Sequence, residues 1–219
     1  MVAFALVLTV IATLLVVIQP QAKWLVMSAA SAIILGAYLV GLYILYRYGA
    51  GIAEEEASET SHSLKWGWIV FGLSSGAIFS SAPLLAFSAQ HLAELTGISE
   101  SFLGVFLVAI VTTLPELTTT AAAIRIGAPD LAIAGMYGTN AINIAILGVA
   151  DFFSPSGSLF QDLDVSHVTA GLFAIILTSL GLVQIMLRRP LRRFAITEPS
   201  TLVMVVIYLL ALFMVFRMG

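Results

Sequence analysis

The chain has 219 residues, of which 60% are hydrophobic and 10% are charged. Soluble domains are typically about 45–50% apolar and about 25% charged, so this composition excludes an ordinary soluble domain and indicates a membrane protein. The absence of cysteine excludes disulfide bonds, thiolate metal sites and thiol nucleophiles. The net charge of -3 is too small to indicate binding to nucleic acid or to anionic lipid.

Seven apolar segments reach, or nearly reach, the roughly 20 residues that a membrane-spanning helix requires. The first has no basic residue ahead of it and no small-residue cleavage site before Gln19 and Pro20, so we expect a spanning helix and not a cleaved signal peptide. The predicted fold class is therefore all-α, a polytopic membrane helical bundle of about seven transmembrane helices. The segments cover residues 2–18, 24–46, 66–90, 101–124, 131–150, 166–187 and 200–216.

The basic residues of the loops predict the orientation, because cytoplasmic loops carry an excess of lysine and arginine. Of the nine basic residues, Lys23 and Arg217 fall on one side of the predicted membrane and seven fall on the other. The side with seven should be cytoplasmic, which places the N-terminus inside and the C-terminus outside. These seven are Arg47, Lys65, Arg125, Arg188, Arg189, Arg192 and Arg193.

The polar stretch at residues 49–65 is predicted to be an acidic cytoplasmic linker. Acidic, serine-rich tracts cannot bury enough apolar surface to form a core, which favours a solvated linker. A weak cation sensor built from its acidic residues and His62 is the alternative. The linker separates residues 1–48, with two predicted helices, from residues 66–219, with five. Its acidic residues are Glu54, Glu55, Glu56 and Glu59.

Residues 112–120, TTLPELTTT, place a carboxylate inside an apolar helix. A charged side chain within a bilayer costs about 3 kcal/mol or more, so it usually faces a polar cavity and has a function. Pro115 lacks an N–H and displaces the carbonyl of Val111, so we expect the helix to bend or open there. Four threonines, three and four residues before and after Glu116, share its face and surround it with oxygens. They are Thr112, Thr113, Thr119 and Thr120.

The alternative for this stretch is structural. Threonines in membrane helices often hydrogen-bond to the carbonyl four residues earlier, and a lone glutamate can be protonated and paired.

The next predicted helix carries a second set of oxygen ligands. It follows a tight turn in the stretch IRIGAPD, and its Thr139 and Asn143 share one face, with Asn140 beside them. Gly135 and Gly138 allow another backbone to approach closely and tolerate an interrupted helix. Asparagine also joins membrane helices through hydrogen bonds, which is the alternative for this helix.

The candidate ligands favour a hard cation, because all of them are oxygens and His91 and His167 lie near predicted helix ends. Na⁺, Ca²⁺ and Mg²⁺ take oxygen ligands, whereas zinc and copper prefer imidazole or thiolate. Mg²⁺ gives up its waters reluctantly, so a dry cavity suits Na⁺ or Ca²⁺ better. We expect no cofactor and no enzymatic activity, since neither a nucleophile–base pair nor a phosphate-binding loop is visible.

Together the two helices resemble the α-repeat of the sodium/calcium exchanger, or cation/calcium exchanger, superfamily. The family pattern G-T-S-x-P-E resembles residues 111–116, VTTLPE, and the pattern G-N-x-x-G-S-N-x-x-N/D resembles residues 134–143, AGMYGTNAIN. The resemblance covers about residues 66–217. It implies that Glu116 is the essential ion-binding glutamate and that the carbonyl of Ala109 lies near the ions. The matching side-chain ligands are Thr112, Thr113, Thr139 and Asn143.

Several positions depart from the family pattern. Val111 replaces a glycine and Gly135 an asparagine, while Thr113 and Thr139 replace serines and keep the hydroxyl. These changes bear on ion selectivity more than on ion binding. Asn143 does not titrate, whereas the family often has aspartate there, which favours Na⁺ over protons as the coupling ion.

The resemblance also implies an architecture. The family has ten helices in two inverted five-helix halves, each with one α-repeat. Residues 66–219 resemble the second half, with its α-repeat at about residues 101–150, and residues 1–48 resemble the last two helices of the first half. Only one α-repeat is present. We therefore expect a truncated chain, or one that takes a second α-repeat from a missing N-terminal part or another subunit.

Two functions are compatible with these patterns. The first is a secondary antiporter that moves Ca²⁺ or a similar cation against Na⁺ or H⁺, as a multi-pass protein of a cell membrane, here a prokaryotic inner membrane. The second is a non-transporting remnant or an assembly subunit of such an exchanger. An upstream reading frame that encodes another proline–glutamate α-repeat would favour the antiporter. The expected partners are the lipid bilayer, inorganic cations and the second α-repeat, and no nucleic acid is expected.

Overall fold

The computed structural model describes residues 1–20, 23–24, 27–49, 64–103, 106, 108–154, 158–187 and 199–218. Most of the predicted acidic linker lies outside these residues, and so do the four arginines between residues 188 and 193.

Helices make up nearly all of the described structure, which confirms the predicted all-α class. The exception is one pair of two-residue antiparallel strands, in which Lys23 lies opposite Ser28 and Trp24 opposite Met27. The elements are α1 (Val2–Ile18), β1 (Lys23–Trp24), β2 (Met27–Ser28), α2 (Ala29–Gly49), α3 (Leu64–Thr96), α4 (Glu100–Leu103), α5 (Ala109–Arg125), α6 (Pro129–Ala150), η2 (Asp151–Phe153), α7 (Leu159–Asp162), α8 (Val165–Leu187) and α9 (Pro199–Met218).

Each predicted membrane segment contains a helix. Among the described residues, five helices are long and apolar enough to cross a membrane, namely α2, α3, α6, α8 and α9. The helices α1 and α5 have 17 residues each, at the lower limit of about 17–25 residues for a span. The segment predicted at residues 101–124 contains both α4 and α5, with π-helical backbone at Phe106 and Val108 between them. The chain is thus a polytopic helical membrane protein.

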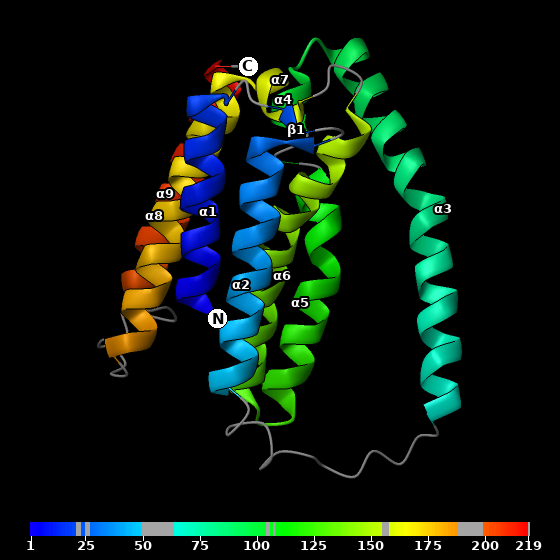
Figure 1. Cartoon of the computed structure of the whole chain (residues 1–219), viewed down its shortest axis with the longest axis vertical. Helices are drawn as coiled ribbons and strands as arrows, with labels where there is room; N and C mark the ends of the chain where they lie inside the picture. Colours follow the sequence, from blue (N-terminus) through cyan, green and yellow to red (C-terminus); the bar gives the residue numbers. More distant parts are fainter. Residues whose placement is uncertain are drawn as a thin grey trace.

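The core lies where α1, α2 and α6 meet. Two clusters of buried side chains fill this contact. One joins α1 to α2 and is closed at its end by Phe160 of α7, which is fully buried. The other joins α1 to α6 through Leu8 and Tyr137. The helix α8 packs on the far side of α1 and α9 packs against α8, while α5 packs along α6 (Figure 1).

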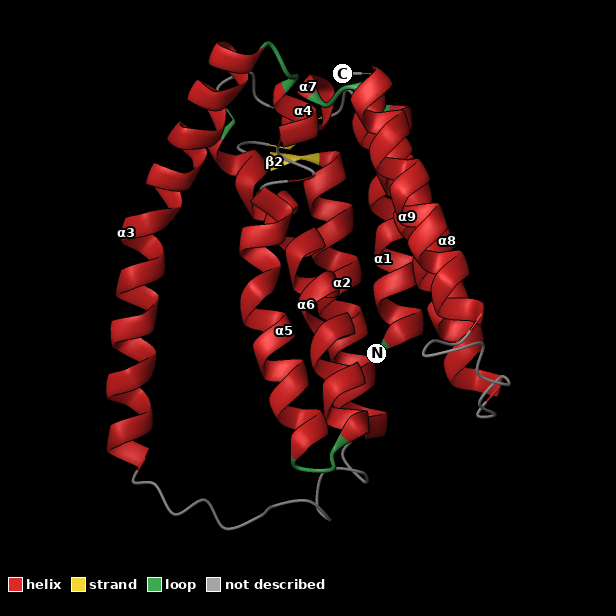
Figure 2. Ribbon diagram, turned by 180° about the vertical axis from the view of Figure 1, so that it is seen from behind, coloured by secondary structure: helices red, strands yellow, loops and turns green. Residues whose placement is uncertain are grey.

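The long helix α3 stands apart from this bundle in both views (Figures 1 and 2). Its main neighbour is the short helix α4, and Ala93 is its one buried residue among those whose side chains are described. An apolar helix of this length with no protein around it is in contact with lipid or with another membrane helix.

The turns alternate between the two ends of the bundle, as a spanning protein requires. The strands, α4, α7 and the C-terminus lie at one end, and the turn between α5 and α6 lies at the other (Figure 1). The predicted orientation places the strand end outside the cell.

Cysteine labelling tests that orientation on a single helix. Ile126 and Phe153 lie beyond the two ends of α6 and are 75% and 82% exposed. The chain has no native cysteine, so Ile126→Cys and Phe153→Cys each give one label site. An impermeant reagent should reach Phe153→Cys in intact cells and Ile126→Cys only after lysis. The reverse pattern would contradict the orientation.

Glycine permits the closest contact between α1 and α8. A methyl group added at Gly171 would lie 2.5 Å from Oγ1 and 3.3 Å from Cβ of Thr13, a buried and β-branched side chain. On α2, a methyl group at Gly36 would meet nothing within 4 Å. We expect Gly171→Ala to lower the free energy of unfolding by about 1–3 kcal/mol through overpacking. Gly36→Ala should be neutral or slightly stabilising, since alanine favours helices. Equal melting temperatures in the two variants would contradict this packing.

Candidate functional site

The candidate site is built on the hairpin formed by α5 and α6. Gly127 ends α5 in the left-handed conformation, with a φ of 80°. The N–H of Ala128 donates to the carbonyl of Ala123 at 2.9 Å, and the N–H of Gly127 donates to that of Ile124 at 3.1 Å. This pair of bonds is the Schellman motif of a helix end. Pro129 then starts α6, at a position where its missing N–H removes no helical bond.

The tight turn sets the register of the two helices. They run antiparallel and pack along each other, so residues equally far from the turn lie at the same level. Ala123 lies opposite Ala132, and both are 6% exposed. Thr120 lies opposite Gly135, and these two line the same pocket. The same register predicts that Glu116 is level with Thr139 one turn farther on, and Thr112 with Asn143 two turns farther on.

The carboxylate of Glu116 is the unusual feature of this hairpin. The residue is half-buried, and its Oε2 is buried without a hydrogen-bond partner among the described residues. Polar atoms removed from water are nearly always hydrogen-bonded, because an unpaired one is unfavourable. A cation bound to this oxygen would compensate for the missing partner.

The threonine hydroxyls donate to their own helices. Oγ1 of Thr112 donates to the carbonyl of Val108 at 2.9 Å, that of Thr113 to Ala109 at 2.8 Å, and that of Thr139 to Gly135 at 3.1 Å. These are the hydrogen bonds expected if the threonines have only a structural role. It does not remove them as ligands, since a hydroxyl that donates its proton keeps two lone pairs for a cation. Thr112 and Thr113 are also exposed.

The backbone of α5 bears on two expectations, one about Pro115 and one about Ala109. The prediction that the helix opens at Pro115 is wrong, because α5 is helical throughout Ala109–Arg125. Proline removes one helical hydrogen bond, but its φ suits a helix, and the contact with α6 supports α5 along its length. The irregular backbone lies two turns earlier, at Phe106 and Val108. The carbonyl of Ala109, expected near the ions, already accepts hydrogen bonds from Thr113 and, at 3.2 Å, from Thr112.

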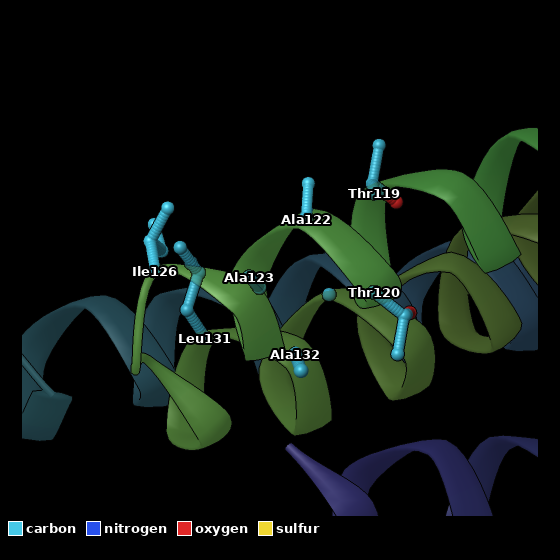
Figure 3. Close-up of a pocket in the computed structure, with 8 residues that line it drawn as sticks. Thr119, Thr120, Ala122, Ala123, Ile126, Leu131 and Ala132 are labelled. Carbon is cyan, nitrogen blue, oxygen red and sulfur yellow. The ribbon is translucent and has the colours of Figure 1, made fainter.

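A pocket of about 390 Å³ opens between α5 and α6 beside their turn (Figure 3). Its lining is mostly apolar, with the hydroxyl groups of Thr119 and Thr120 at the end nearer Glu116. It contains none of the six predicted ligands. The pocket therefore lies next to the candidate site and not in it.

In the part of the chain that the structure describes, the charged groups elsewhere do not form a competing metal site. Within the described residues, no group of three or more histidine, aspartate or glutamate side chains is placed to hold a metal ion. His91 lies near the end of α3, 3.4 Å from the carboxylate of Glu94, and His167 lies near the start of α8. A cation on the hairpin would thus depend on one carboxylate and several neutral oxygens.

Sequence reasoning missed one buried carboxylate. Asp151 follows α6 and is 3% exposed. Its side chain accepts hydrogen bonds from the start of α2 and from Leu159. An aspartate at the end of an apolar helix, ahead of two phenylalanines, is the signal that could have drawn attention to it.

The fold and the site define a multi-pass membrane protein with one acidic residue inside a helical hairpin. The family model described as "Sodium/calcium exchanger protein" matches residues 66–217, so the chain belongs to the sodium/calcium exchanger family. This match confirms the resemblance predicted from the α-repeat.

Two relatives carry transporter names. A protein of Alkalimonas amylolytica named as an antiporter, CaxA, is 29% identical over 167 residues, which are 70% of this chain and 52% of that protein. The sodium/calcium exchanger MaX1 of Methanosarcina acetivorans is 39% identical over 84 residues, which are 38% of this chain and 24% of that protein. The chain spans about half the length of the first and a quarter of the second. No solved structure matches significantly.

Proposed function

We propose that the chain is the second-repeat part of a secondary cation antiporter, which moves Ca²⁺ or a similar cation across the cell membrane against Na⁺ or H⁺. The α5–α6 hairpin would hold the cation, with Glu116 as the charged ligand. Thr112, Thr113, Thr139 and Asn143 would supply neutral oxygens.

The observation that carries this proposal is the buried Oε2 of Glu116, which lacks a partner among the described residues. It lies level with Thr139 by the register of the hairpin, on the face of α5 that continues through Thr120 to the buried Ala123. A cation between the helices would satisfy the carboxylate and draw on the lone pairs of nearby hydroxyls. The family membership and the transporter names of the two relatives support the same assignment.

The ligands favour Na⁺ or Ca²⁺. Both ions take oxygen ligands, and Ca²⁺ accepts six to eight of them in flexible geometry. A single carboxylate balances the charge of one Na⁺ but leaves Ca²⁺ with one uncompensated positive charge, which is unfavourable in a low dielectric. Ca²⁺ therefore needs a second carboxylate from outside this hairpin.

A second α-repeat would supply that carboxylate. Four threonines of α5 are exposed, namely Thr112, Thr113, Thr118 and Thr119, and α3 is hardly covered by the rest of the chain. Residues 66–219 would form one half of the exchanger, and residues 1–48 would belong to the end of the other half. A second copy of this chain in the opposite orientation would reverse the seven-to-two distribution of basic residues, so we expect a different polypeptide.

A non-transporting role, as a remnant or an assembly subunit, is the second candidate. The observation in its favour is that the hydroxyls of Thr112, Thr113 and Thr139 donate to carbonyls of their own helices, as in a purely structural role. A coding sequence for the other α-repeat next to this gene would argue against it.

Ion flux in proteoliposomes tests the proposed function. The chain is reconstituted with a polypeptide that carries a proline–glutamate α-repeat, and Na⁺ and H⁺ gradients are imposed separately. We expect uptake of Ca²⁺ driven by one of the two gradients. Absence of gradient-driven uptake of any hard cation, in vesicles shown to contain both polypeptides, would contradict antiport.

A further inference from the structure

The carboxylate of Asp151 joins three segments that are far apart in the sequence. Its Oδ2 accepts hydrogen bonds from Oγ of Ser31 at 2.6 Å and from the N–H of Ser28 at 3.2 Å. Its Oδ1 accepts from the N–H of Leu159 at 2.6 Å. Ser28 ends β2 just before α2, Ser31 lies in the first turn of α2, Leu159 begins α7, and Asp151 directly follows α6. All of these lie at the same end of the bundle as the strands (Figures 1 and 2).

The start of α2 is built to receive this carboxylate. Oγ of Ser28 accepts a hydrogen bond from the N–H of Ser31 at 3.2 Å, so Ser28 caps the helix. A negative charge next to the N-terminus of a 21-residue helix is also favoured by the helix dipole. Ser28, Ser31 and Asp151 are 1%, 0% and 3% exposed, so little water competes for these bonds.

These contacts require both side-chain oxygens of residue 151 to accept hydrogen bonds. A carboxylate accepts on each oxygen, whereas an asparagine amide accepts on one side and donates on the other. In either orientation, the side-chain NH₂ of Asp151→Asn would face another donor, the backbone N–H of Leu159 or that of Ser28. The substitution changes the shape very little but loses at least one buried hydrogen bond.

These bonds fix the outer end of α6 against α2. Farther along the same contact, a methyl group at Gly148 would lie 3.0 Å from Leu35 of α2, so the two helices are also closely packed there. Asn143 and Thr139 precede Asp151 on α6 by about 12 and 18 Å along the helix axis. The turn at Gly127 joins α6 to α5 at the other end of the bundle, so a freed outer end of α6 would tilt and shift both residues relative to Glu116.

We propose that Asp151 is a positioning residue. With Ser28, Ser31 and Leu159 it forms a clamp that holds the outer end of α6 beside α2, and so keeps Thr139 and Asn143 beside α5 at the level of Glu116. The clamp itself does not depend on the proposed function, but its role in positioning cation ligands rests on it. The helices α2 and α6 would then move as one body during transport.

Two measurements on the full chain test this proposal, with Asp164→Asn as the control because Asp164 is an exposed aspartate at the same end. Without added ions, hydrogen exchange at the amides of Ser28 and Leu159 should be about tenfold faster or more in Asp151→Asn, and unchanged in the control. At a temperature where every variant is fully folded, the concentration of Na⁺ or Ca²⁺ at half-maximal binding should rise about tenfold in Asp151→Asn alone. Ser31→Ala removes one of the three bonds, so it should change the exchange rates and the ion affinity less than Asp151→Asn does. If Asp151→Asn does not fold, Ser31→Ala takes its place in both measurements.

Unchanged exchange in Asp151→Asn would overturn the clamp. Faster exchange with unchanged ion affinity would overturn the positioning role. A wild-type chain that binds neither ion would contradict the proposed function, and with it the positioning role, whereas the exchange rates would still decide the clamp.

Discussion

Replacing Glu116 with glutamine is expected to abolish cation binding and leave the protein folded. The amide keeps the shape of the side chain and removes its negative charge. A unit charge about 4 Å from a cation contributes about 4 kcal/mol at an effective dielectric of about 20. That free energy corresponds to about a thousandfold in affinity. The measurement is the rise in melting temperature on adding Na⁺ or Ca²⁺, which reports binding to the folded state.

The control for this prediction is Glu94→Gln, because Glu94 is 59% exposed and belongs to α3, outside the hairpin. Glu94→Gln should keep the full ion response. Without ions, Glu116→Gln should melt no lower than the wild type, since a neutral amide is easier to bury than an unpaired carboxylate. An undiminished ion response in Glu116→Gln would show that this carboxylate does not bind the cation.

Ca²⁺ flux is expected to depend on a second α-repeat. Purified chain alone should give vesicles no more permeable to Ca²⁺ than empty ones. Addition of a polypeptide that carries a proline–glutamate helix should produce gradient-driven flux, because a second carboxylate balances the divalent charge and covers the exposed threonines of α5. The experiment compares flux with and without the added polypeptide, at matched amounts of this chain.

The control for flux is the same pair of polypeptides with Glu116→Gln in this chain. Flux should then fall to the background, which shows that both repeats take part. Robust Ca²⁺ flux from this chain alone, shown to be monomeric in the same membranes, would contradict the requirement for a partner.

The helices could be predicted from the sequence because apolar runs of this length have few alternatives in a bilayer. Their ends were less predictable. The helix α3 continues past residue 90 to Thr96, where Gly97 in the left-handed conformation follows it. The helix α2 starts at Ala29 and not at residue 24, because the residues before it form the strand pair. Boundaries of this kind depend on turns and caps, which leave weak signals in hydropathy.

Helical periodicity made one part of the candidate site predictable, namely which residues of α5 share a face. The spacing of Thr112, Glu116 and Thr120 places them on one face, and the turn at Gly127 fixes which residues of α6 lie opposite. Whether Pro115 opens its helix depends on the packing around α5, and the helix stays intact. The bonds of Asp151 join residues 120 and 123 positions apart, a separation that no local pattern encodes. The convergence of the six proposed ligands around a cation stays a prediction.

Anomalous scattering from Sr²⁺, which replaces Ca²⁺ and takes the same oxygen ligands, tests the central claim most directly. In crystals of the chain with its second α-repeat, we predict one strong anomalous peak between α5 and α6. The peak should lie at coordination distance from the carboxylate of Glu116, slightly beyond the about 2.3–2.6 Å of Ca²⁺ because Sr²⁺ is larger, and level with Thr139. It should vanish in Glu116→Gln. A strong peak elsewhere, with the carboxylate of Glu116 still free of any cation, would contradict the assignment of this hairpin as the cation site.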